Sequence, residues 1–120
     1  MKEKKTIEFL GQQIEVQLLD HTPEGHENAI AGVLPTEAGE PFKIWFNGLI
    51  ADSTLVHECW HLFMTMMGAL DNEPKYFLEL NTEIYAYNFH TLYRLVKDTV
   101  TGMKSYKTLY KKRNRRAEQQ

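Results

Sequence analysis

Residues 7–18 alternate between apolar and polar positions, and the apolar positions are Ile7, Phe9, Ile14, Val16 and Leu18. A period of two residues is typical of strands that bury one face. Between the two apolar groups lies Gly11-Gln12-Gln13, a short polar segment that favours a tight turn. The pattern therefore predicts an antiparallel hairpin near the start of the chain.

Two further apolar segments, residues 29–34 and 42–46, are short enough to be strands and are separated by the turn-forming residues 35–41. Residues 21–28 are rich in turn formers and are predicted to form a loop. We expect residues 43–46 to form the most exposed strand, which ends at Asn47-Gly48. An extended peptide could then pair with this strand through main-chain hydrogen bonds.

From about residue 54 onward the pattern becomes helical. Residues 55–70 predict a first helix, at whose start Asp52 or Ser53 can accept backbone amide hydrogens. Asn72 and Pro74 predict the start of a second helix that continues to about Val100. This second helix is apolar on nearly all sides, so we expect it to be packed between neighbours. A third, weaker amphipathic segment follows residue 103.

Length and composition fit one small globular domain, with 120 residues, 42% hydrophobic and 25% charged. The apolar segments are too short and too interrupted to span a membrane, and the start of the chain lacks the apolar core of a signal peptide. The single cysteine, Cys59, does not require an oxidising compartment. The expected location is therefore the cytoplasm.

The net charge of -2 is unevenly distributed. Residues 1–103 carry 7 basic and 15 acidic residues, whereas residues 104–120 carry 7 basic residues and Glu118 alone. We expect one domain over residues 1–103 and a basic C-terminal helix or tail over residues 104–120. A solvated helix end is one interpretation of the tail, and contact with nucleic acid or an acidic partner is the other.

The first predicted helix contains His57-Glu58-Cys59-Trp60-His61, an H-E-x-x-H pattern. Two histidines four residues apart project from one face of a helix, so both imidazoles can bind one metal ion, with zinc the expected ion. Glu58 is rotated away from that face and can instead accept a proton from water at the metal. The pattern therefore predicts a metal-dependent hydrolase, with Glu58 as the general base.

A catalytic zinc site needs a third protein ligand, and the second predicted helix offers Glu83 and Glu79. Glu83 is the first choice, because a carboxylate among apolar neighbours is costly unless a cation compensates its charge. Glu79, one turn earlier, could replace it or orient a histidine. Tyr87 and His90, on the same face as Glu83, could donate a hydrogen bond to an oxyanion, although core packing is an alternative for both. Cys59 is expected to be a small buried residue.

The H-E-x-x-H segment, followed by Glu83-Ile84-Tyr85-Ala86-Tyr87, resembles the short zincin metallopeptidases of the gluzincin type, especially the ImmA/IrrE-like and phage-encoded ones. The resemblance covers roughly residues 42–96. It implies a small sheet ahead of the H-E-x-x-H helix, zinc bound by His57, His61 and Glu83, Glu58 as general base, and hydrolysis of peptide bonds in proteins.

The sequence thus predicts an α+β fold, in which a small antiparallel or mixed N-terminal sheet packs on two long helices that carry a zincin-type metal site, with a short basic helix at the C-terminus. The predicted function is zinc-dependent peptide hydrolysis with a protein or peptide substrate. The alternative is a catalytically degenerate zincin fold that binds a protein or nucleic-acid partner.

Overall fold

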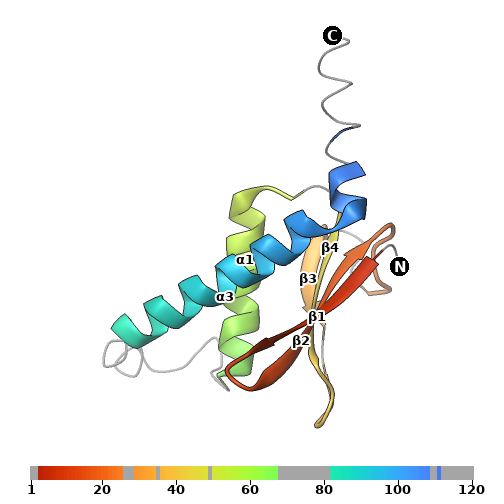
Figure 1. The fold of residues 1–120 in the computed structure, drawn as a ribbon. Helices are drawn as coiled ribbons and strands as arrows, with labels where there is room; N and C mark the ends of the chain where they lie inside the picture. The colour runs from red at the N-terminus through yellow and green to blue at the C-terminus, as the bar shows by residue number, and fades with distance from the viewer. Residues whose placement is uncertain are drawn as a thin grey trace.

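Four strands form one mixed sheet in the computed structural model of the chain (Figure 1). The structure describes residues 3–25, 29–34, 36–48, 50–67, 82–108 and 111, and for residues 82–85 it describes the backbone only. The strands are β1 (Glu3–Phe9), β2 (Gln12–Leu19), β3 (Ala31–Leu34) and β4 (Phe42–Asn47), and their order across the sheet is β1-β2-β4-β3. The α+β class and the mixed sheet are as predicted.

The predicted hairpin is confirmed, with a shorter turn than expected. β1 and β2 pair antiparallel, and only Leu10 and Gly11 connect them. Both residues have positive φ, 50° and 76°, as the tightest hairpin turns require. Gln12 and Gln13, which we assigned to the turn, are therefore already part of β2 and pair with Phe9 and Glu8.

β4 lies inside the sheet, so the prediction that residues 43–46 form an exposed edge strand was wrong. β4 pairs in parallel with β2 and antiparallel with β3. Its central residues Ile44, Trp45 and Phe46 are all fully buried. A strand that is buried on both faces has a continuous apolar run, which is the pattern of an interior strand. The edge of the sheet next to β4 is β3.

Both long helices lie on the same side of the sheet (Figure 1). α1 spans Asp52–Met66, and the described part of the second long helix, α3, spans Thr82–Gly102. The core between helices and sheet combines residues from every layer: Ile14, Val16, Leu18, Ile44 and Phe46 from the sheet, Leu55, Cys59, Leu62 and Phe63 from α1, and Leu92, Val96 and Val100 from α3.

The first helix begins slightly earlier than predicted and is capped differently. Ala51 is the N-cap residue and makes no side-chain capping hydrogen bond, so the prediction that Asp52 or Ser53 caps the helix was wrong. Asp52 lies in the first turn instead, and its Oδ1 is 3.4 Å from Lys97 Nζ on α3. This ion pair links the start of α1 to the second half of α3.

Within its described part, α3 is packed on one side rather than surrounded by neighbours. Leu92, Val96 and Val100 are buried, whereas Tyr87 and Arg94 are exposed. The expected start of this helix near Asn72 and Pro74 lies outside the described residues. A short helix over residues 104–108 follows α3. Among the described residues, no helix is long and apolar enough to cross a membrane.

The sheet face opposite the helices is buried around Trp45 and exposed along β1, at Lys4, Thr6 and Glu8. Trp45, Gln17 and Leu19 are buried there, because they alternate with the core-facing residues of their strands. Gly32 of β3 is paired with Trp45, and a Cβ atom on Gly32 would lie 2.8 Å from Trp45 Nε1. Glycine at position 32 therefore lets the indole pack directly against the backbone of β3.

Candidate metal centre

The amphipathic pattern of α1 determines where its histidines lie. Leu55, Cys59 and Leu62 occupy the side that packs on the core, and this rotates His57 and His61 to the open side of the helix. The two imidazoles come together there: His57 Nε2 and His61 Nε2 are 3.1 Å apart, and the ring centroids are 4.6 Å apart at an interplanar angle of 77°. The predicted histidine pair is thus a close pair in the structure.

This spacing fits a shared metal ion. Two nitrogen ligands at about 2.0 to 2.1 Å from one tetrahedral zinc ion lie about 3.3 to 3.4 Å apart. The observed 3.1 Å between the Nε2 atoms is within a few tenths of an ångström of that spacing. It is also a hydrogen-bond distance, so the pair can be held together by one imidazole donating to the other. The side chain of His57 is 66% exposed, which leaves the pair accessible to an ion from solvent.

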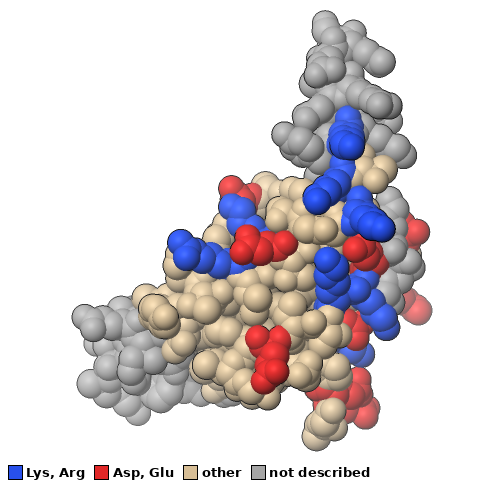
Figure 2. Space-filling view, viewed as in Figure 1, with Lys and Arg blue, Asp and Glu red and all other residues tan. Residues whose placement is uncertain are grey.

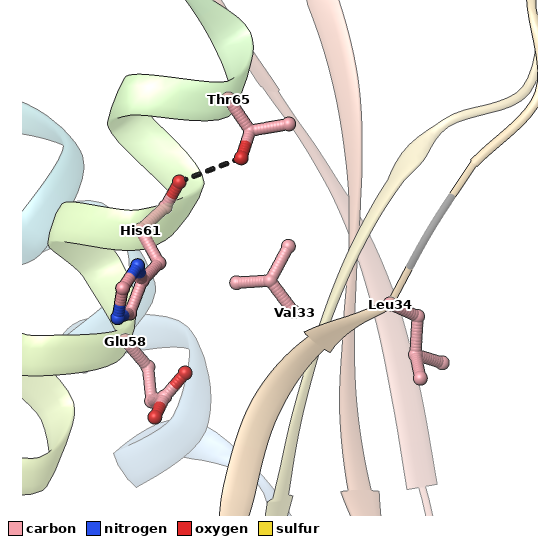
Figure 3. A pocket seen from close by; sticks show the side chains of 5 residues that line it. All are labelled: Val33, Leu34, Glu58, His61 and Thr65. Carbon is pink, nitrogen blue, oxygen red and sulfur yellow. Dashed lines mark hydrogen bonds between the residues drawn. The ribbon is translucent and has the colours of Figure 1, made fainter. Parts of the chain in front are cut away.

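Glu58 lies beside the histidines, in a pocket between α1 and β3. The pocket has a volume of about 390 Å³ and is lined by Val33, Leu34, Glu58, His61 and Thr65. Figure 3 shows the Glu58 carboxylate on the side of α1 that faces β3, with Val33 pointing toward the helix. The Glu58 side chain is only 14% exposed, and its Oε1 is 3.9 Å from His57 Nε2. A carboxylate in this position can exchange a proton with a molecule held in the pocket.

The two residues predicted as a third ligand, Glu83 and Glu79, lie outside the side chains that the structure describes. Glu83 belongs to the first turn of α3, but its side chain is outside the described part, as is the whole of Glu79. Among the side chains that the structure describes, no group of three His, Cys, Asp or Glu is close enough to hold a metal ion. The structure therefore brings together His57, His61 and Glu58, and both candidates for the third ligand remain predictions.

Tyr87 and His90 lie on the exposed side of α3. Tyr87 is 75% exposed, and the His90 ring stacks on Tyr93 with 6.4 Å between the ring centroids. Among the described residues, no hydrogen bond or ring contact joins either residue to the pair on α1. Their suggested role as donors to an oxyanion therefore also stays a prediction, but neither is the core residue that we gave as the alternative.

Cys59 is fully buried, as predicted. Burial, followed by the charge of neighbouring Glu58, raises the pKa of the thiol to about 12. At neutral pH this side chain is a protonated thiol and acts as a small apolar residue. The next residue, Trp60, is 39% exposed and contacts Phe89 of α3, with the ring centroids 5.1 Å apart. Cys59 and Trp60 thus attach α1 to the core and to α3.

The pocket is also lined by Thr65, Val33 and Leu34, which were not predicted as site residues. Thr65 lies four residues after His61 and seven residues after Glu58. Helical spacing could therefore have placed it on the same face of α1 as these two residues. Its Oγ1 donates a hydrogen bond of 2.8 Å to the carbonyl oxygen of His61 (Figure 3). Val33 and Leu34 could not have been found in this way, because they reach the pocket only through the order of the strands.

Comparisons of the chain with protein-family models, with curated proteins and with solved structures give no match. The features of the described structure that bear on function are the histidine pair, Glu58 and the adjoining strand β3.

Proposed function

We propose that this chain is a zinc-dependent metallopeptidase, in which His57 and His61 hold the metal and Glu58 is the general base. The observation that carries the proposal is the histidine pair, with 3.1 Å between its Nε2 atoms, next to a largely buried carboxylate in a pocket. The proposal takes Glu83 as the third ligand and Glu79 as the second choice. It agrees with the resemblance to short gluzincin-type peptidases.

Each protein group has a defined task in this mechanism. Zinc, when bound, supplies Lewis-acid chemistry for the carbonyl group that is attacked. The carboxylate of Glu58 accepts a proton from the attacking water and then gives it to the departing amine. Because the Glu58 side chain is only 14% exposed, its carboxylate is partly shielded from bulk water where it lines the pocket.

The edge strand β3 supplies a surface for an extended peptide. The amide N–H of Asn47 donates to the carbonyl oxygen of Ile30 at 2.8 Å, so residues 30 and 47 form a hydrogen-bonded pair. In an antiparallel ladder, hydrogen-bonded pairs alternate with non-hydrogen-bonded pairs. Val33 and Ile44 form the third pair after residues 30 and 47, so they are a non-hydrogen-bonded pair. The N–H and C=O of Val33 therefore point away from β4, along the open edge and beside the pocket. A substrate strand would pair here and not with β4.

The catalytic assignment is tested with the Glu58→Gln variant. We expect it to bind zinc as the wild type does and to lose at least about 100-fold in kcat/KM for peptide hydrolysis, since general bases contribute that much or more. His57→Ala is expected to lose zinc, measured by metal analysis of the purified protein. Comparing Glu83→Ala with Glu79→Ala identifies the third ligand. Full activity of Glu58→Gln, or normal zinc content in His57→Ala, would overturn the proposal.

The binding surface is tested with Val33→Pro. Proline removes an N–H that makes no bond to β4, so the sheet should persist while one main-chain hydrogen bond to the peptide is lost. We expect KM to rise about tenfold with zinc content unchanged, which corresponds to one hydrogen bond. Val33→Thr keeps the N–H and nearly the same volume, and serves as the matched control. Equal KM values for the two variants would show that peptides do not pair with β3.

A further inference from the structure

The segment after α3 exposes lysines along one side. Lys104, Lys107 and Lys111, which we call the basic end, are spaced by three and four residues, and all three are exposed. In a helix this spacing places side chains next to one another on one face. Figure 2 shows Lys and Arg without intervening Asp or Glu where the chain leaves the body after α3. The basic end is thus a concentrated positive charge.

The start of the basic end is fixed to the body of the protein. The Glu3 carboxylate accepts a hydrogen bond of 3.0 Å from the backbone N–H of Ser105 and so joins the first strand to the short helix. Met103 is fully buried, and Tyr106 is partly buried against the core. Because its apolar residues face inward, the described part of the short helix presents its lysines to solvent on a fixed support.

The lysines of the basic end differ from Lys43 and Lys97 in making no ion pair within the described part of the chain. Lys43 Nζ is 3.3 Å from Glu40 Oε2, and Lys97 Nζ is 3.4 Å from Asp52 Oδ1. Within the described part of the chain, no ion pair involves Lys104, Lys107 or Lys111. Like charges three or four residues apart repel one another, and an external polyanion would remove this repulsion.

We propose that the basic end binds the phosphate backbone of nucleic acid without base specificity. In the sequence it continues into Lys111-Lys112-Arg113-Asn114-Arg115-Arg116, a density of positive charge that is typical of nucleic-acid-binding segments. The 7 basic residues of 104–120 stand against one acid, whereas residues 1–103 carry 15 acids and 7 bases. Phosphates would therefore be attracted to the basic end and repelled by the rest of the chain.

Other partners fit the described surface less well. A helix that lies on a membrane needs an exposed apolar face, and a stable protein interface needs aromatic or aliphatic anchors. Beside the lysines, Met103 is buried, and Tyr106 is half-buried and lines a pocket of about 290 Å³ with Thr101, Lys107 and Lys111. Residues 104–108 thus offer one half-buried aromatic side chain and no broad apolar face. The exposed lysines are therefore the main feature that a ligand meets here, which favours phosphate as the recognised group.

The test measures binding of the full chain to a fluorescently labelled DNA duplex over a range of salt concentrations, in parallel with a single strand of the same sequence. Each neutralised phosphate contributes about -0.9 to the slope of log K against log salt for a duplex. The triple variant K104Q/K107Q/K111Q should therefore have a slope smaller in magnitude by about 2.7. When the salt concentration rises from 50 to 200 mM, both proteins lose affinity for the duplex, and the factor lost by the triple variant should be about 40 times smaller than the factor lost by the wild type.

The matched control is K43Q/R94Q/K97Q, which removes the same number of positive charges from other surfaces. We expect its salt slope to equal that of the wild type. Equal slopes for the two triple variants would overturn the proposal, because binding would then reflect net charge alone. Failure of the wild type to bind either nucleic acid, or binding to anionic lipid vesicles in place of DNA, would overturn it as well.

Discussion

Replacing Gly32 by alanine is expected to disturb the attachment of β3 to the sheet. An alanine Cβ at this position would lie 2.8 Å from Trp45 Nε1, 3.1 Å from Cε2 and 3.2 Å from Cζ2. The 2.8 Å contact is shorter than Cβ atoms in proteins make and the other two are tight, so one partner must move. Trp45 is fully buried and cannot rotate into solvent. We therefore expect β3 to move away from the indole, which shifts Val33 and Leu34 at the pocket.

The expected loss of stability follows from this overlap. Forcing additional carbon atoms into a packed interior costs about 1 to 3 kcal/mol. Replacing glycine by alanine also lowers the conformational entropy of the unfolded chain, which stabilises the folded protein by about 0.4 to 1 kcal/mol. Gly32→Ala should therefore lower the free energy of unfolding by about 1.3 kcal/mol, the difference between the midpoints of the two effects.

The assay is equilibrium unfolding in urea, followed by circular dichroism and by tryptophan fluorescence. Gly102→Ala is the matched control, because nothing lies within 4 Å of its Cβ position at the end of α3. This control should raise the free energy of unfolding by up to about 1 kcal/mol, since alanine is the better helix former. The two glycine-to-alanine changes should thus have opposite signs.

A double-mutant cycle with Trp45→Leu isolates the overlap from other effects. Leucine lacks all three indole atoms that an alanine at position 32 would meet. In the Trp45→Leu background, Gly32→Ala should cost at least about 1 kcal/mol less than in the wild type. An identical cost in both backgrounds would refute the assignment of the penalty to the indole, as would a stabilised Gly32→Ala single variant.

Two further predictions concern Glu3 and Cys59. The hydrogen bond from the backbone N–H of Ser105 lowers the pKa of Glu3 from its ordinary value of 4.5, so this contact stabilises the fold above that pH and is lost as the pH falls through the lowered pKa. The stability difference between wild type and Glu3→Gln should accordingly shrink between about pH 6 and about pH 3, as measured by urea unfolding, and a constant difference would contradict this. Burial raises the pKa of Cys59 to about 12, so a thiol reagent should label Cys59 in the native protein only as fast as the protein unfolds around it. Immediate labelling at neutral pH would contradict this, because it would show that the thiol is accessible.

The elements that sequence analysis predicted best are those with local signals. The alternation over residues 7–18 indicated the hairpin, and the apolar spacing over residues 55–66 indicated the helix that carries the histidines. The close approach of His57 and His61 follows from the same helical spacing, because residues four apart lie one turn apart on one face. Each of these features depends only on residues that are near one another in the chain.

The errors arose where distant segments decide the outcome. The position of β4 depends on its pairing with both β2 and β3, and the hairpin pattern contains no information about that choice. The uninterrupted Ile44-Trp45-Phe46 was a usable sign of burial on both faces, which alternation alone does not give. The cap of α1 was also mispredicted, because the helix begins at Asp52 and so places this residue in its first turn, where it makes an ion pair with Lys97.

The two edges of the sheet differ in how well they resist joining with another molecule. β1 has seven residues and carries Glu3, Lys4, Lys5 and Glu8, and charges of this kind discourage strand-to-strand aggregation. β3 has four residues, Ala-Gly-Val-Leu, and none of them is charged. Self-association of concentrated protein should therefore proceed through β3, and a short peptide that occupies this edge should suppress it. Because β3 is only four residues long, a strand that pairs with it can form few main-chain hydrogen bonds. Binding at this edge should therefore be transient.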